Sequence, residues 1–167
     1  MLENNIKISF VVLDLVPQGG VRVIIDIANS LANEGYNVHI YTSRKVVASL
    51  FSISTNVEMH YVLNIKNKTI SYLLFPLILP FSLSGDLIVC SFYYFRLSCK
   101  IAAYLRRTSY CYFIQGIENF RTGFLSGILN FLCNKSLYDK NLLVSNRYLA
   151  NKVSDVIGRN VDYIGVG

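Results

Sequence analysis

The sequence predicts an α/β fold, a Rossmann-like, doubly wound and mostly parallel sheet of six to seven strands in a three-layer α/β/α arrangement. Short apolar runs alternate with helical periodicity along all 167 residues, a pattern typical of successive strand–helix–strand units. The strand candidates are nearly continuous runs of Val, Ile and Leu, as in strands buried on both faces. A Gly19-Gly20 pair separates the first strand from the first helix, and such turns often bind anions at the helix N-terminus.

The first forty residues predict a strand, a helix and a second strand. The first strand covers residues 6–13. Residues 21–34 carry an apolar stripe at helical spacing, and Gly35 is the expected helix stop. The second strand, residues 38–42, is parallel to the first because a helical crossover joins them. Gly19-Gly20 is expected to form a tight turn with positive φ and to leave bare N–H groups for an anion.

The rest of the chain continues this alternation. Residues 72–83 are apolar except for Ser82, but this segment contains Pro76 and Pro80 and is shorter than the ~20 residues of a spanning helix. We therefore expect a kinked helix packed on the sheet. The other expected elements are a helical or irregular piece at 46–51, strands at 57–62, 87–91, 110–114, 141–144 and 161–164, and helices at about 97–105, 124–132 and 146–156, with Ser145-Asn146 as the last N-cap.

Composition fits a single domain over residues 1–167 with a large core. Hydrophobic residues make up 53% of the chain and charged residues 16%, so we expect some apolar surface for a partner or a bilayer. The net charge of +6 can be explained by solubility alone, by binding of an anionic ligand or by contact with an anionic membrane. The four cysteines lack a Cys-x-x-Cys pair and predict buried thiols. His39 and His60 are interpreted as strand residues rather than as metal ligands, and no metal site is expected.

Ligands of doubly wound sheets bind beyond the carboxyl ends of the strands. This rule selects the polar residues and glycines that follow the predicted strands: Gly19, Gly20, Arg22, Ser43, Arg44, Ser91, Tyr93, Gln115, Glu118, Ser145 and Arg147.

The residues at these strand ends can be compared with the motifs of three classes of protein: dinucleotide-binding oxidoreductases, P-loop proteins and hydrolases. An NAD site needs three spaced glycines and a carboxylate after the second strand, but the chain has Gly19-Gly20 and then Ser43-Arg44. Ser43-Arg44 could hold a 2′-phosphate, which leaves an NADP-binding oxidoreductase as an alternative. The sequence has no Gly-Lys-Ser/Thr of a P-loop and no Gly-x-Ser-x-Gly elbow of a hydrolase.

The same segments resemble the N-terminal domain of retaining GT-B glycosyltransferases of family 4. Gly19-Gly20-Val21-Arg22 is similar to the family's Gly-Gly loop, and the segment 112–120, with Gln115 and Glu118, resembles the corresponding loop of a rhamnosyltransferase-like branch. Segments 143–149 and 163–167 are similar to the end of the first domain and to the approach to the hinge. These matches extend over essentially the whole chain.

The resemblance implies an enzyme of two Rossmann-like domains, of which this chain is the acceptor-side half. A nucleotide-diphosphate sugar would be the donor, bound mainly by a C-terminal domain that the chain lacks, and no other cofactor or metal is implied. The half alone should not complete a transfer. The acceptor would be a saccharide or a lipid-linked saccharide of cell-surface glycan synthesis.

Residue roles follow from the same resemblance. Gly19 and Gly20 would lie near the donor diphosphate, where N–H groups stabilise leaving-group charge, and Arg22 would reinforce them. Gln115 and Glu118 are the catalytic candidates. Gln115 stands where many members have a His, which it cannot replace as a proton acceptor, and Glu118 could contact an acceptor hydroxyl. The remaining cleft residues are Ser43, Arg44, Tyr93, Ser145 and Arg147.

The expected partners are the missing domain, the acceptor and an anionic membrane. We expect a cytoplasmic protein, peripheral on the inner face of the membrane, with Arg96, Lys100, Arg106 and Arg107 as headgroup contacts; no nucleic-acid partner is expected. A non-catalytic module that binds an anion or a partner is a further alternative.

Overall fold

The structure is a computed structural model that describes residues 6–16, 18–44, 51–63, 65–116, 131, 134–135 and 137–165. The chain divides into two compact units, Met1–Tyr110 and Cys111–Gly167. The hydrogen-bonded strand order is β3-β2-β1-β4-β5-β6-β7, and the described pairings are parallel. The predicted Rossmann-like parallel sheet of six to seven strands is therefore confirmed.

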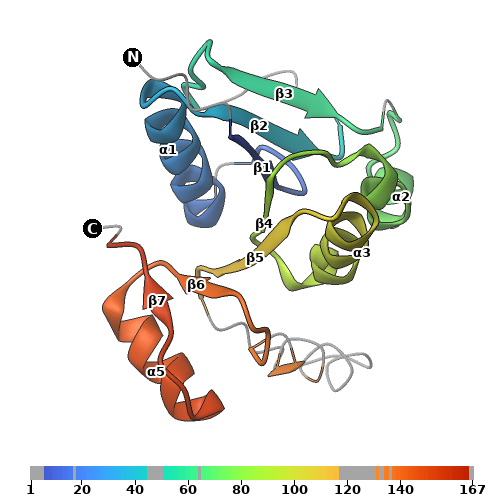
Figure 1. The fold of residues 1–167 in the computed structure, drawn as a ribbon. Helices are drawn as coiled ribbons and strands as arrows, with labels where there is room; N and C mark the ends of the chain where they lie inside the picture. Colours follow the sequence, from blue (N-terminus) through green and yellow to red (C-terminus); the bar gives the residue numbers. More distant parts are fainter. Residues whose placement is uncertain are drawn as a thin grey trace. The chain divides into compact units, whose positions relative to one another are not determined.

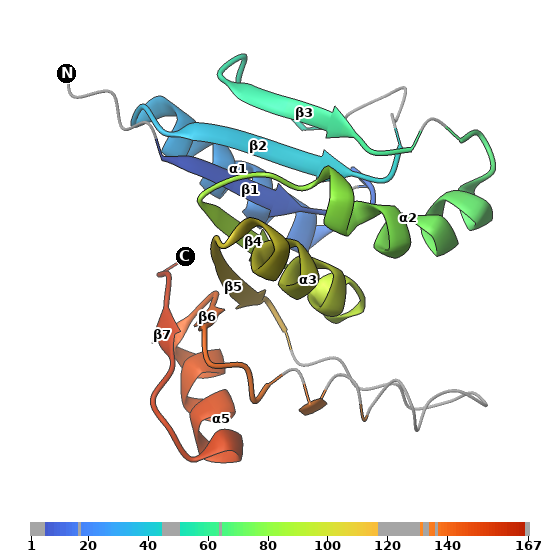
Figure 2. The same ribbon diagram turned by 45° about the vertical axis from the view of Figure 1, so that its right-hand side comes forward.

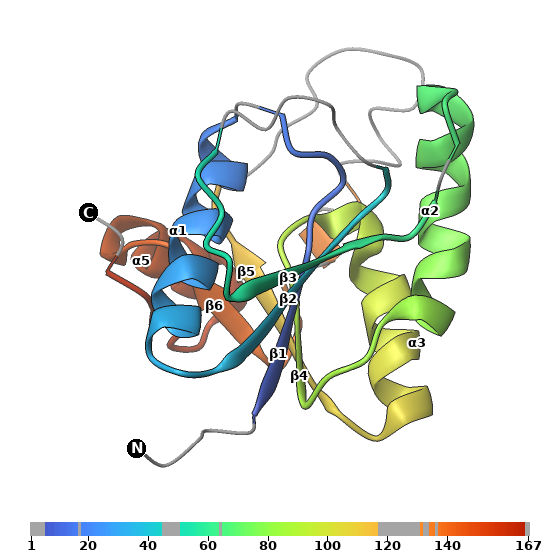
Figure 3. The same cartoon turned by 90° about the horizontal axis from the view of Figure 1, so that it is seen from above.

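The first unit has a sheet between two helical layers. Helix α1 lies on one face of the sheet, and α2 and α3 lie on the other (Figure 3). The elements that begin in this unit are β1 (Lys7–Val11), α1 (Gly19–Asn33), β2 (Asn37–Thr42), β3 (Val57–Tyr61), α2 (Lys68–Ser82), β4 (Leu87–Cys90), the 3-10 helix η1 (Tyr93–Phe95), α3 (Arg96–Arg106) and β5 (Ser109–Ile114) (Figure 1).

The core of this unit lies where α1 covers the central strands. Every residue of β1 after Lys7 is buried, which matches the prediction of a strand covered on both faces. Ile24 and Ile25 of α1 are fully buried. Gly35 has a φ of +91°, so the predicted glycine stop of this helix is confirmed.

Helix α2 contains both prolines of the apolar segment. Asn67 caps it, its Oδ1 accepting from the N–H groups of Thr69 and Ile70 at 3.0 and 3.2 Å. Pro80 has no N–H to donate to the Pro76 carbonyl four residues earlier, and the Ser98 hydroxyl of α3 donates to that carbonyl instead, at 2.6 Å. Within the described chain, none of the helices is both long and apolar enough to cross a membrane.

The turn between α2 and β4 approaches β1 closely at Gly85. This residue has a φ of +153°, and a Cβ built on it would lie 2.8 Å from Ser9 Oγ and 3.1 Å from the Lys7 carbonyl oxygen. A side chain at this position would be strained and overpacked. Gly85 therefore allows β4 to enter the sheet directly beside β1.

The second unit pairs the end of β5 with two short strands. Its elements are β6 (Leu142–Val144), α5 (Arg147–Ile157) and β7 (Asp162–Tyr163), and α5 packs against both of these strands (Figure 2). The helix expected at 124–132 lies outside the described residues except for Phe131, and the piece expected at 46–51 lies outside them except for Phe51.

The N-cap of α5 is Asn146. Its Oδ1 accepts from the Leu149 N–H at 2.9 Å, whereas Ser145 is buried and its N–H donates to the Ile114 carbonyl at 3.1 Å. The expected capping role of Ser145 is therefore wrong, because Ser145 still belongs to the end of the β5–β6 pairing.

Replacing this cap should destabilise the second unit. We expect Asn146→Ala to lower the free energy of unfolding by about 1 kcal/mol, because the Leu149 N–H loses its acceptor. Urea denaturation followed by circular dichroism measures the change. Asn151→Ala, at an exposed position inside the same helix, is the control and should be neutral or slightly stabilising. Equal losses in the two variants would contradict the capping role.

Candidate functional site

Three elements of the first unit meet around the carboxylate of Asp14, just beyond β1. This side chain is 2% exposed, and its Oδ1 accepts from the Leu15 N–H at 3.0 Å. Its Oδ2 accepts from Arg44 Nη2, beyond β2, at 3.2 Å and from the Tyr72 hydroxyl of α2 at 2.8 Å. A buried carboxylate requires such partners, so these contacts connect two strand ends to α2.

The charge of this cluster is balanced between Asp14 and Arg44. Burial, the hydrogen bond to Asp14 and the negative charge of Asp14 together raise the pKa of Tyr72 to about 12, against the opposing effect of Arg44. Tyr72 therefore remains a neutral hydroxyl donor at physiological pH. The Arg44 side chain is 28% exposed, so part of this guanidinium faces solvent at the edge where strand-end ligands bind.

Two polar atoms beside this cluster have no hydrogen-bond partner within the described chain. They are Ser43 Oγ and Arg44 Nε, both buried at the end of β2. A buried polar group without a partner costs about 1–3 kcal/mol. The end of β2 therefore offers a hydroxyl and a guanidinium N–H that a ligand or a water molecule can satisfy.

The glycine loop starts α1 without a capping side chain. The N-cap residue Gln18 makes no side-chain cap hydrogen bond, and the first turn has no acidic residue. Gly19 and Gly20 are both helical, and the described glycines with positive φ are Gly35, Gly85 and Gly158. The expected positive-φ turn at Gly19-Gly20 is therefore wrong: these glycines begin the helix instead of turning the chain.

Gly19 also has no packing reason to be a glycine. A Cβ built on it meets no atom of the described residues within 4 Å, so neither the backbone conformation nor these neighbours require a glycine here. The remaining physical reason is access, because a bare backbone lets an anion approach the N–H groups at the positive end of α1.

The position of this loop in the sheet supports the same use. β1 pairs with β2 on one side and with β4 on the other, so strand order reverses at β1. Ligands of open α/β sheets bind at this switch point, outside the carboxyl ends of the strands. Ser91, which follows β4, donates its hydroxyl hydrogen to the Val11 carbonyl at 3.0 Å and so joins the ends of β4 and β1 at the switch point.

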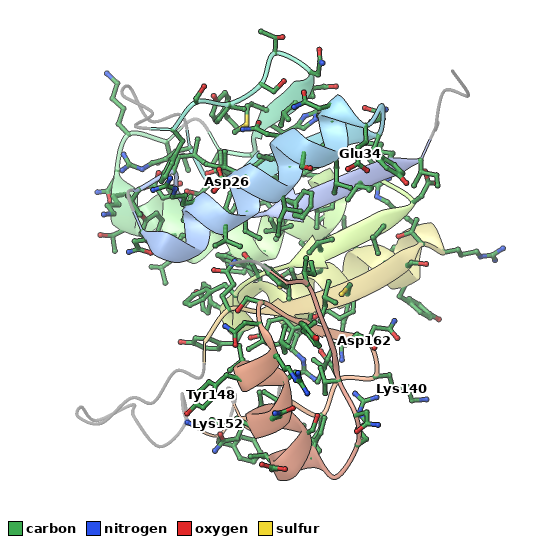
Figure 4. The ribbon with its side chains drawn as sticks, turned by 90° about the vertical axis from the view of Figure 1, so that its left-hand side faces the viewer. Asp26, Glu34, Lys140, Tyr148, Lys152 and Asp162 are labelled. Atoms are coloured by element: carbon green, nitrogen blue, oxygen red, sulfur yellow. The ribbon has the colours of Figure 1, made fainter. Side chains whose placement is uncertain are left out.

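The other predicted residues of the first unit are Arg22 of α1 and Tyr93 of η1. Arg22 Nε lies 3.7 Å from Asp26 Oδ2, with side chains 75% and 63% exposed, and Figure 4 shows Asp26 on the outer face of α1. Such a pair is a solvated helix-face contact. Tyr93 lies in η1 and is half-buried.

The second unit holds the remaining predicted residues. Gln115 follows β5 and is half-buried, Ser145 is buried, and Arg147 is the exposed first residue of α5. Glu118 lies outside the described residues.

Asp14 and Tyr72 are the site residues that sequence reasoning missed. Asp14 is the one charged residue in the apolar stretch 8–16, and this was a usable signal because a charge placed there must find a buried partner. Tyr72 lies 58 positions further along the chain in an apolar segment, and no local pattern distinguishes it from core tyrosines.

Comparisons with known proteins support the fold. No protein-family model matches the chain, and no curated protein does either. Among solved structures, the chain is similar to Anabaena Alr3699/HepE, crystallised in complex with UDP and glucose, with a TM-score of 0.56 and 15% sequence identity. The likeness covers 96% of this chain and 44% of that one, so this chain spans less than half of the HepE chain.

Proposed function

We propose that the chain is the acceptor-side half of a GT-B glycosyltransferase. It would help to move a sugar from a nucleotide-diphosphate sugar to a saccharide or lipid-linked acceptor in cell-surface glycan synthesis. The observation that carries this proposal is the open, uncapped N-terminus of α1 at Gly19, in a fold similar to that of a protein crystallised with UDP and glucose. Exposed N–H groups at this helix end would stabilise the charge of a diphosphate leaving group.

The residues around the loop fit an acceptor side. Ser43 Oγ and Arg44 Nε offer hydrogen bonds to a hydroxyl or carboxylate of a saccharide. A second domain would bind most of the donor and would be needed for the completed transfer, as the resemblance to family 4 implies, so this chain alone should bind the donor weakly through its diphosphate. Gln115 and Glu118 remain the predicted catalytic residues of this proposal, and Tyr93, Ser145 and Arg147 remain predicted cleft residues.

The NADP alternative conflicts with the contacts of Arg44. This side chain was the candidate for a 2′-phosphate, but its Nη2 is paired with the buried Asp14 at 3.2 Å. A 2′-phosphate would have to compete with the buried Asp14 carboxylate for this guanidinium. The missing third glycine counts against the same alternative.

The variant Gly19→Ala provides a test with little structural side effect. Its methyl group meets no described atom within 4 Å but narrows access to the N–H groups of α1. In an NMR titration of the 167-residue chain with UDP-glucose, we expect shifts at the Gly19 and Gly20 amides in the wild type and at least severalfold weaker binding in Gly19→Ala. Gly19→Ala should unfold at the same temperature as the wild type or slightly above it, because alanine favours the helix more than glycine does. Shifts that avoid the glycine loop, or tighter binding of NADP than of UDP-glucose, would overturn the proposal.

We further propose that α2 and α3 form the surface that contacts an anionic membrane. Both helices expose large apolar side chains: Ile70, Leu73, Leu77 and Phe81 on α2, and Leu97, Ile101, Tyr104 and Leu105 on α3. Arg96, Lys100 and Arg106 lie on α3, and Arg107 directly follows it. Basic residues near an anionic bilayer contribute about 1 kcal/mol each, and exposed apolar residues add hydrophobic insertion.

Vesicle sedimentation tests this membrane surface. We expect the chain to pellet with vesicles that contain anionic lipid at low salt and to remain in solution with neutral vesicles. Leu73→Ser/Leu77→Ser, two side chains that are 61% and 67% exposed, should reduce the bound fraction severalfold. Failure of the wild-type chain to pellet with anionic vesicles would remove the membrane contact from the proposal.

A further inference from the structure

The outer two strands of the first unit bring together three side chains that can bind a metal ion. His39 of β2 is the register partner of Glu58 of β3, and His60 lies two residues after Glu58 on the same face of the sheet. One ligand atom from each residue lies within 4.8 Å of the other two. His39 and His60 are 21 positions apart in sequence, and only the parallel β2–β3 pairing places them side by side.

The hydrogen bonds of His39 orient its ring for metal binding. Its Nε2 lies 2.8 Å from Asn37 Oδ1, an acceptor, so the network assigns the ring proton to Nε2 and leaves the lone pair on Nδ1. This Nδ1 lies 2.7 Å from His60 Nε2. In metal sites, the histidine ring nitrogen that does not bind the metal usually donates its hydrogen to an oxygen acceptor, and this hydrogen bond fixes the orientation of the ring.

Contacts with neighbouring side chains also position the other two proposed ligands, His60 and Glu58. The His60 ring stacks on Tyr41 at 4.4 Å and on His39 at 5.0 Å between centroids. Glu58 Oε1 lies 3.2 Å from His60 Nε2, and Glu58 Oε2 lies 3.5 Å from His39 Nδ1. The carboxylate therefore faces both ring nitrogens.

Metal binding requires one hydrogen to move within His60. Because His39 Nδ1 accepts the hydrogen bond between the two rings, His60 Nε2 carries the hydrogen in the metal-free protein. That hydrogen would move to His60 Nδ1, and the lone pair freed on Nε2 would then bind the metal.

We propose that His39 Nδ1, His60 Nε2 and the Glu58 carboxylate form a binding site for Zn²⁺ or a similar divalent transition metal. Two histidines and one glutamate are a known zinc ligand set that leaves a fourth position for water. Two ligands bound at about 2.0–2.1 Å in tetrahedral geometry lie about 3.4 Å apart, so the two ring nitrogens must separate by less than 1 Å. The side chains of His60 and Glu58 are 30% and 61% exposed and lie at the sheet edge, so they have room to make this movement.

The surrounding charge sets the affinity of such a site. Lys7 opposes a cation, but its Nζ donates to Ser84 Oγ at 2.9 Å, and Glu58 brings the compensating negative charge. A bound ion would replace the hydrogen bond between the two histidines and join β3, the edge strand of the sheet, to β2. This zinc site would be independent of the proposed glycosyltransferase function.

Calorimetry with tag-free, chelator-treated protein tests the proposal. At pH 7.5 we expect one Zn²⁺ to bind per chain, and we expect Glu58→Gln and His60→Gln each to weaken binding by about tenfold or more. Glu34→Gln is the matched control, because Glu34 is an exposed carboxylate at the end of α1 (Figure 4), and it should bind as the wild type does. Since Glu58 is mostly exposed, its variant keeps the test valid if His60→Gln does not fold.

Spectroscopy identifies the ligands. The chain has only two histidines, so the imidazole NMR signals of both should shift on addition of Zn²⁺. Bound Co²⁺ should give visible bands without a thiolate charge-transfer band, which separates this site from the four cysteines. Absence of zinc binding, equal affinity of Glu58→Gln and the wild type, or a thiolate band would each overturn the proposal.

Discussion

The metal-free protein should lose about 2–3 kcal/mol of unfolding free energy between pH 7 and pH 4 through His39 alone. Its pKa falls from 6.5 to about 4 on folding, first because of burial and then because of Lys7. As the pH falls below 6.5, His39 binds a proton in the unfolded chain but stays neutral in the folded chain until the pH approaches 4. The stabilisation is therefore present above pH 6.5 and is lost as the pH falls toward 4, at about 1.4 kcal/mol per pH unit.

The measurement is urea denaturation at several pH values between 4 and 8, in the presence of a chelator. Other groups also titrate in this range, so the difference between wild type and His39→Gln isolates the histidine. Although this variant is less stable at pH 7, its stability should depend less steeply on pH between 6.5 and 4. Parallel curves for the two proteins would show that His39 does not carry the effect.

The second large effect is expected at Asp14. Asp14→Ala should lower the free energy of unfolding by about 3 kcal/mol, because it removes the acceptor of Arg44, Tyr72 and the Leu15 N–H at once. Removing one partner of a buried ion pair costs about 3–5 kcal/mol, and the partial exposure of Arg44 places the estimate at the lower end.

Asp26→Asn is the control for this variant. Asp26 also pairs with an arginine, but both side chains are mostly exposed, so the change should stay below about 0.5–1 kcal/mol. Equilibrium urea unfolding at pH 7 measures both variants. Similar losses for Asp14→Ala and Asp26→Asn would show that the buried cluster does not stabilise the fold.

Local pattern was sufficient for most of the fold. Continuous apolar runs predicted the central strands, the apolar stripe of residues 21–34 predicted α1, and Gly35 predicted its end. These features depend on neighbours within a few residues of each other. The expected turn at Gly19-Gly20 failed because a glycine pair fits a helix start as well as a positive-φ turn.

The site depends on contacts that local pattern does not contain. Arg44 and Ser43 could be selected because they directly follow a predicted strand. Asp14, the buried partner of Arg44, also accepts a hydrogen bond from Tyr72 of a distant helix. The pairing of His39 with His60 depends on the register of two parallel strands. A shift of one residue in that register would send Glu58 and His60 to the opposite face.

The hydrogen bond from Ser98 to the Pro76 carbonyl also bears on how the α2–α3 surface meets a bilayer. Because it ties the two helices together at the point where Pro80 leaves the backbone unpaired, their outer side chains keep a set spacing before any contact occurs. A preformed surface loses little conformational entropy on binding. In the proposed membrane contact, lipid would therefore meet two helices that are already joined, and the affinity would depend on the residues they expose rather than on a folding step at the membrane.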